Sequence, residues 1–197
     1  MKKIIGLLLI FISGIIYCQD FRIYHPIADS LIAKTTVGKK VTYSYQNYLF
    51  DITGRIMKFK DNKKLIYSDE APEGIRKVIP SIFISDSTAD QVVLYTEMMT
   101  ENMSGFSLYL LNGLETKLIG YFPLALEASI SKANKTSPRT QSLIDYLILE
   151  TNGNTWRISF KTEKIVIHPG TDREEVIKGD EAKFIFNGKK LKEVKDF

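Results

Sequence analysis

The sequence predicts an all-β protein: an antiparallel β-sandwich or a soluble barrel of about ten strands, with one short helix. From residue 41 onward, short runs rich in Val, Ile, Tyr, Phe and Thr are separated by Asn, Asp, Gly and Pro, a pattern typical of antiparallel strands. Three Asn-Gly pairs, which begin at Asn112, Asn152 and Asn187, stand between apolar runs. Asn-Gly is the strongest short signal for a β-hairpin, because both residues accept the positive φ of a type I′ turn.

The hairpin expected at residues 152–153 has a register that the apolar pattern supports. A two-residue turn there sets Leu149 opposite Trp156. The same register sets Leu147 opposite Ile158, so that four apolar side chains share one face. Because the turn chemistry and the apolar pattern agree, this hairpin is the strongest structural prediction of the sequence.

The chain after this hairpin is expected to add a third strand to it. If residues 161–164 form a loop, Phe160 meets Ile165 on the same apolar face. All three strands then contribute to one side of the core.

The other two Asn-Gly pairs predict hairpins of unequal clarity. At Asn187-Gly188 a two-residue turn pairs Phe184 with Leu191. At Asn112-Gly113 the same rule gives a face of mixed polarity, so a longer loop is expected and the register of the Asn112-Gly113 hairpin stays open.

The remaining elements are predicted from composition. Residues 26–34 are expected to form the short helix, because Pro is favoured in a first turn and the apolar residues that follow share a face. Residues 123–133 fit either a strand or a helix, and the polar residues 131–142 form a loop. A further turn is expected at Asp61-Asn62. Other strands are expected at residues 42–52, 55–59, 64–68, 81–85 and 91–98.

The first eighteen residues have the build of a secretory signal peptide. Lys2 and Lys3 give a positive start, and residues 4–17 are apolar or small, too short a run for the roughly 20 residues of a membrane-spanning helix. We expect residues 1–18 to be removed and residues 19–197 to form a single β-rich domain with no transmembrane span. The protein is then exported, to the periplasm or the extracellular space.

The single cysteine, Cys18, allows a second interpretation of the leader. It either ends the leader, with cleavage between Cys18 and Gln19, or becomes the lipidated first residue of a lipoprotein. A lipoprotein signal has a small residue before its cysteine, whereas this chain has the bulky Tyr17. The sequence therefore favours cleavage after Cys18, which leaves a mature chain without thiol chemistry.

Composition and charge exclude several classes of function. The 44% hydrophobic and 25% charged residues are those of a globular protein, and the net charge of +4 is too small to predict nucleic-acid binding. Glycine-rich phosphate loops and His-Glu-x-x-His are missing from the sequence. We therefore expect no cofactor.

Catalytic candidates are few. Paired carboxylates are what a glycoside hydrolase or a calcium site needs, and an aspartate four residues after a histidine would be able to orient it as a general base. A solvated turn, or a turn that follows a strand, explains the same residues without catalysis. The candidates are Asp86, Asp90, Glu97, Glu101, His168 and Asp172.

Two further patterns suggest binding. Met98, Met99 and Met103 offer thioethers to a soft metal such as Cu(I), although methionine also fills gaps in a core.

Aromatic residues in the 42–52 strand form the second pattern. Tyr43, Tyr45 and Tyr48 would stack on a sugar or an apolar ligand if they were exposed. In one continuous strand Tyr43 and Tyr45 lie on one face, and Tyr48 and Phe50 on the other. Ordinary packing is then the alternative.

Export, a β scaffold and the lack of a coherent catalytic motif together predict a function. We expect a non-catalytic module of a Gram-negative cell envelope that binds a small ligand, a glycan or an envelope protein. The alternatives are a small carboxylate-based hydrolase and a lipoprotein anchored through Cys18.

Overall fold

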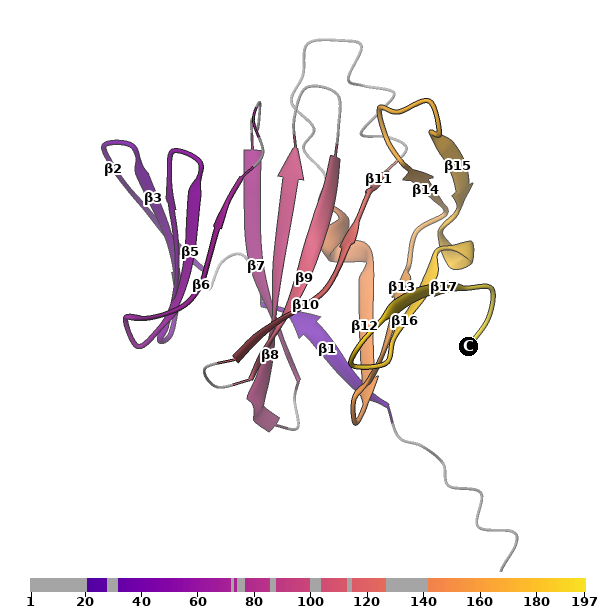
Figure 1. Ribbon diagram of the computed structural model, residues 1–197, viewed down its shortest axis with the longest axis horizontal. Helices are drawn as coiled ribbons and strands as arrows, with labels where there is room; N and C mark the ends of the chain where they lie inside the picture. Colours follow the sequence, from indigo (N-terminus) through magenta and orange to yellow (C-terminus); the bar gives the residue numbers. More distant parts are fainter. Residues whose placement is uncertain are drawn as a thin grey trace, which may run out of the picture.

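The computed structural model describes residues 21–27, 32–71, 73, 77–85, 88–99, 104–112, 115–126 and 142–197. The signal peptide and its cleavage site, expected within residues 1–19, therefore lie outside the described residues. Within them, seventeen strands pair antiparallel in three sheets (Figure 1). The predicted all-β antiparallel fold is confirmed. The strands outnumber the ten that were predicted, because short polar strands carry little apolar signal.

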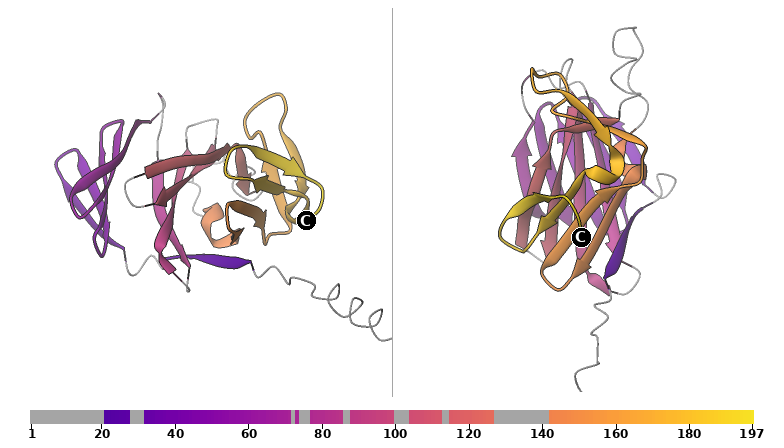
Figure 2. Two further views of the ribbon diagram at one scale, coloured as in Figure 1. Left: turned by 60° about the horizontal axis from the view of Figure 1, so that its bottom comes forward. Right: turned by 90° about the vertical axis from the view of Figure 1, so that its right-hand side faces the viewer.

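The largest sheet has nine strands and curls into a nearly closed, barrel-like shape (Figure 2). In spatial order its strands are β10 (Glu115–Phe122), β9 (Ser104–Asn112), β8 (Thr88–Met99), β7 (Lys77–Ser85), β1 (Arg22–Pro26), β12 (Leu147–Asn152), β13 (Thr155–Phe160), β16 (Lys183–Phe186) and β17 (Leu191–Val194). The two end strands approach one another, and Gly120 makes room for Leu191 there. The Lys117 ammonium donates to the carbonyl of Gly188 across the same gap.

Two smaller sheets complete the fold. The five-stranded sheet runs in chain order through β2 (Ala33–Val37), β3 (Lys40–Tyr45), β4 (Tyr48–Thr53), β5 (Ile56–Asp61) and β6 (Lys64–Glu70). The three-stranded sheet consists of β11 (Leu124–Leu126), β14 (Lys164–Ile167) and β15 (Glu175–Lys178). Two short 3₁₀ turns, η2 (Leu143–Tyr146) and η3 (Gly179–Glu181), are the helical elements of the described residues.

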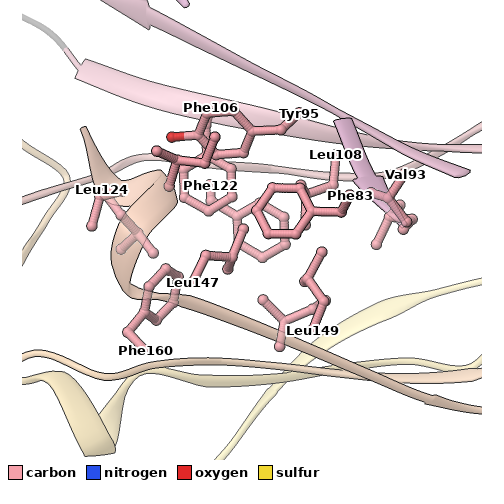
Figure 3. Packing of buried hydrophobic residues seen from close by; sticks show 14 of the residues in the cluster. Phe83, Val93, Tyr95, Phe106, Leu108, Phe122, Leu124, Leu147, Leu149 and Phe160 are labelled. Carbon is pink, nitrogen blue, oxygen red and sulfur yellow. The ribbon is translucent and has the colours of Figure 1, made fainter. Parts of the chain in front are cut away.

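Apolar side chains gather in two clusters on opposite faces of β7, β8 and β9. The barrel core contains stacked rings such as Phe106 and Phe122, whose centroids lie 4.8 Å apart (Figure 3). The intersheet core lies between the outer face of these strands and the five-stranded sheet, and it includes Phe59 and Leu94. Because β8 is covered on both sides, its residues 92–97 are buried without interruption.

The expected helix at residues 26–34 is not supported by the ends of that segment. Pro26 closes strand β1, and Ala33 opens strand β2; residues 28–31 lie outside the described residues. Proline is tolerated at Pro26 because it stands at the end of its strand, where its missing N–H breaks no ladder. Residues 123–133, for which the sequence fitted either a strand or a helix, begin with strand β11, and residues 127–141 lie outside the described residues.

The hairpin between β12 and β13 forms, but its predicted register is wrong by one turn position. The turn consists of Gly153 and Asn154, so Leu149 pairs with Ile158 and Thr151 with Trp156. Gly153 takes the positive φ of 57° at the first turn position, as a type II′ turn requires. The shift moves the pairing by two residues and so leaves the apolar face unchanged.

Two other pairings also differ from the predictions. Strand β13 pairs with β16 rather than with β14, because β14 leaves the barrel sheet to pair with β11 and β15. In the last hairpin Phe186 pairs with Leu191. The side chain of Asn187 accepts from the backbone N–H of Lys189 and Lys190 and so closes a four-residue loop.

The hairpin between β9 and β10 is shorter than expected. Asn112 pairs with Glu115, so two residues connect the strands. A bulge between Leu118 and Gly120 interrupts the alternation of β10.

Candidate functional site

An apolar cavity lies between the five-stranded sheet and the outer face of the barrel sheet. It encloses about 280 Å³ of space between atoms, part of it open to solvent. The five-stranded sheet supplies one wall, and β7 and β8 supply the other. The lining residues are Ile32, Tyr43, Ser44, Tyr45, Tyr48, Phe50, Phe59, Pro80, Ser81, Ile82 and Leu94.

The three sequence-predicted tyrosines line this cavity together. Residues 42–52 are not one strand, because Gln46 and Asn47 form a turn in which Gln46 takes a φ of 50°. In the resulting hairpin Tyr45 pairs with Tyr48, and Tyr43 with Phe50. Paired residues share a face, so all four rings lie on the side that meets the barrel sheet. The expected division of these rings between two faces is therefore wrong.

Buried aromatic rings hold the tyrosine wall in place. The rings of Tyr48 and Phe59 are stacked, with centroids 5.6 Å apart and planes inclined by 20°. Phe50 packs against Phe59, with ring centroids 6.5 Å apart. Phe50 and Phe59 are almost completely buried, whereas the tyrosines keep part of their surface exposed. The cavity therefore has a fixed apolar floor and an aromatic rim.

The opposite wall comes from β7 and β8. Ile82 and Leu94 pair across these strands and belong to the intersheet core. Pro80 is accommodated inside β7 because β1 covers only residues 83–85 of that strand, and the proline breaks no ladder on the uncovered side. Sequence reasoning missed this wall, since no local pattern says which strands face β3 and β4.

Among the described residues, the cavity lining carries hydroxyl groups and no charged side chain, although Lys34 and Asp61 lie beside its tyrosines. Burial raises the pKa of Tyr48, and the negative charge of Asp61 raises it further; the phenol therefore stays neutral at physiological pH. The Tyr45 hydroxyl accepts from the side-chain amide of Gln46 at 3.2 Å. The Lys34 ammonium lies 5.5 Å from the centre of the Tyr43 ring. The site offers ring faces and a few hydrogen-bonding groups, which suits an uncharged ligand.

Among the carboxylate candidates, Glu97 is buried inside the protein. Only 3% of its surface is exposed, and its carboxylate accepts from the hydroxyls of Tyr95, at 2.7 Å, and Ser142. Burial and the negative charge of Glu97 raise the pKa of Tyr95 well above its ordinary value. These contacts join β8 to the start of η2 and account for Glu97 as a structural acid. The side chains of Asp86, Asp90 and Glu101 lie outside the described residues, so their expected convergence stays a prediction.

The histidine candidate lies at an exposed turn. His168 takes a φ of 50°, and its carbonyl accepts from the hydroxyl and the backbone N–H of Thr171. Among the described residues, no hydrogen bond joins the His168 ring to Asp172. Within the described residues the segment is accounted for as a turn after a strand.

Of the three methionine candidates only Met98 has a described side chain, so their expected cluster stays a prediction. Met98 is partly buried and packs against the intersheet core. Nothing is described of the side chains of Met99 and Met103. The described part of the chain contains no group of three or more His, Cys, Asp or Glu side chains that would hold a metal ion. It also contains no helix long and apolar enough to cross a membrane.

Comparison of the chain with protein-family models, with curated proteins and with solved structures finds no match.

Proposed function

We propose that this protein is a binding module that holds a small, uncharged and mainly apolar ligand in the cavity between its two large sheets. The observation that carries the proposal is the meeting of Tyr43, Tyr45 and Tyr48 on one wall of this cavity. Small-molecule sites are concave and mostly apolar, with few polar groups that orient the ligand. The tyrosine rim and the buried floor fit this description.

The size of the cavity limits the ligand. The 280 Å³ between its walls include space that is open to solvent, so the enclosed part is small. We therefore expect a ligand of one ring system or a short hydrocarbon chain that lies only partly inside the cavity, with its polar end toward the tyrosine hydroxyls. The flat faces of the rings favour a planar ligand, because offset stacking adds to the gain from burial.

Equilibrium dialysis with two uncharged probes, indole and 1-octanol, tests this function. We expect saturable binding of indole, and we expect Tyr45→Leu and Tyr48→Leu each to raise the dissociation constant about tenfold through the lost stacking surface. Tyr121→Leu is the matched control, because Tyr121 is a partly exposed strand tyrosine on β10, outside the cavity lining. Equal binding by all variants, or no saturable binding of either probe, would contradict the proposal.

The proposal also places the protein outside the cytoplasm, in the cell envelope of a Gram-negative bacterium. It rests on the basic start and the apolar run of residues 1–18. Mass spectrometry of the full-length gene product, exported from a Gram-negative host, tests it. A chain that starts at Gln19 supports secretion. A lipidated chain that starts at Cys18 would show a membrane-tethered lipoprotein instead.

A further inference from the structure

One end of the five-stranded sheet has two protruding hairpin tips. The turns Gly38-Lys39 and Gly54-Arg55 connect β2 to β3 and β4 to β5 at this end, which lies at the upper left in Figure 1. Both glycines have a positive φ, and a Cβ built on either would meet nothing within 4 Å. A side chain at either glycine would therefore meet no other part of the described molecule.

Apolar side chains stand exposed beside both tips. Val37 is 72% exposed and Ile56 is 48% exposed. The pairing places them in one row of the outer face, with Lys40 and Thr53 between them. Adjacent strands lie about 4.8 Å apart, so the row places the two apolar groups roughly 14 Å apart on one edge of the sheet. Single exposed apolar residues are common on proteins, but this pair lies at the outermost row of a protruding end.

Positive charge is concentrated on the same sheet. Residues 32–71 contain eight Lys and Arg and four Asp and Glu, whereas the rest of the chain contains equal numbers of both kinds. At the tips Lys39, Lys40 and Arg55 surround the apolar pair. Two of these cations are in ion pairs: the Lys40 ammonium lies 3.2 Å from Asp51, and the Arg55 guanidinium lies 3.5 Å from Glu70. Lys39 adds a positive charge for which the described residues contain no ion pair.

We propose that this end of the five-stranded sheet docks on the surface of an anionic lipid bilayer. Val37 and Ile56 enter the interface between headgroups and acyl chains, and the cations contact lipid phosphates. Neither signal is sufficient alone, because stable peripheral attachment needs an apolar contact together with electrostatic attraction. The tips combine an exposed apolar pair with cations, whereas a soluble polyanion would contact only the cations. The aromatic cavity is lined from other rows of the same sheet, so a docked molecule keeps that site available.

Co-sedimentation with vesicles tests the proposal. One set of vesicles contains phosphatidylcholine and phosphatidylglycerol in equal amounts, and the other contains phosphatidylcholine alone. We expect the chain that lacks its leader to bind the anionic vesicles at low ionic strength and to be released by salt, because electrostatic attraction falls off within a Debye length. No binding to the anionic vesicles would overturn the proposal.

Variants separate the two signals without disturbing the fold. Lys39→Glu is expected to weaken binding at least tenfold, because it reverses a charge at the bilayer surface. The double variant Val37→Thr and Ile56→Thr keeps the β-branched shape of a strand residue and is expected to weaken binding about tenfold as well. We expect the melting temperatures of these variants to stay unchanged, because the substituted positions are exposed.

Matched controls come from parts of the molecule outside the five-stranded sheet. Lys189 follows a turn glycine with a positive φ as Lys39 does, and Val176 is an exposed strand valine on β15. Lys189→Glu and Val176→Thr are expected to leave vesicle binding unchanged. Losses in the controls equal to those at the tips would overturn the proposal. The proposal would also be overturned if the protein bound soluble dextran sulfate as tightly as vesicles and if Val37→Thr and Ile56→Thr did not change this binding.

Discussion

Asp51 lies on the outer face of the five-stranded sheet, yet only 5% of its surface is exposed. The Lys60 ammonium and the Thr42 hydroxyl donate to its carboxylate at 2.7 Å each, and Lys40 lies 3.2 Å away. Burial by itself favours the neutral acid, but the hydrogen bonds from Lys60, Thr42 and Lys40 outweigh it and lower the pKa of Asp51 below its ordinary 3.8. The ionised carboxylate therefore ties three strands together.

This arrangement predicts a pH-dependent effect of Asp51→Asn. A carboxyl whose pKa is lower in the folded chain stabilises the fold above its unfolded pKa, and this stabilisation is lost as the pH falls through the folded pKa. We expect the substitution to lower the free energy of unfolding by about 1–3 kcal/mol at neutral pH and by much less at a pH of about 2. Urea unfolding at both pH values measures the difference. An equal loss at both would contradict the role of the charge.

Arg157 contacts two aromatic rings at opposite ends of the described chain. Its guanidinium carbon lies 3.8 Å from the centre of the Phe21 ring and 5.3 Å from that of Phe197. We expect Arg157→Gln to lower the free energy of unfolding by about 0.5–2 kcal/mol. Arg173→Gln, at an exposed position in a turn, is the control in thermal unfolding. A loss in the control as large as that in Arg157→Gln would show that the rings contribute nothing specific.

For the individual strands, the success of the sequence predictions depended on whether the turns between them could be recognised. The composition of the strands predicted β5 and β6 to within two residues at each end, but it missed the first four residues of β7 and the first three of β8. The turn at Gln46 and Asn47 was missed, since it contains neither glycine nor proline and nothing local marks Gln46 for a positive φ. The three tyrosines were named from the sequence, but their common face depends on this one turn.

Close approach between elements also depends on single glycines. Gly179 begins η3, and a Cβ built on it would overlap with the backbone carbonyl oxygen of Thr162. We expect Gly179→Ala to cost about 1–3 kcal/mol or more, since backbone cannot move aside cheaply. Gly153→Ala is the comparison, because its added methyl group meets open space. Only the strain of its positive φ is then expected to lower the free energy of unfolding, by about 1 kcal/mol. Chemical denaturation measures both, and equal losses would contradict the packing argument.

At the scale of the whole molecule, β7 to β9 form a layer shared by both apolar clusters. The order of strands in the sheets was not predictable from the sequence, because β13 finds its partner β16 across two intervening strands that leave the barrel. Likewise the second wall of the cavity depends on which sheet covers the outer face of β7 and β8. A continuous buried run such as residues 92–97 indicates only that some partner covers each face.

The shared layer predicts that the two clusters unfold together. Leu94 is fully buried in the intersheet core, and we expect Leu94→Ala to cost about 2–5 kcal/mol. The single tryptophan, Trp156, lies in the barrel core, so its fluorescence reports the other cluster. The fluorescence and far-ultraviolet circular dichroism transitions are expected to shift together. Leu65→Ala, at an exposed position, should shift neither by more than about 0.5 kcal/mol. Two separate transitions would contradict a shared layer.

An amide NMR titration of the chain with indole tests whether the tyrosine-lined cavity is the binding site. We expect saturable shifts that are confined to residues around the cavity, with those of Tyr45, Tyr48 and Ile82 among the largest, and we expect these shifts to be lost in Tyr48→Leu. Shifts that are absent, that do not saturate, or that gather in another part of the molecule would contradict it.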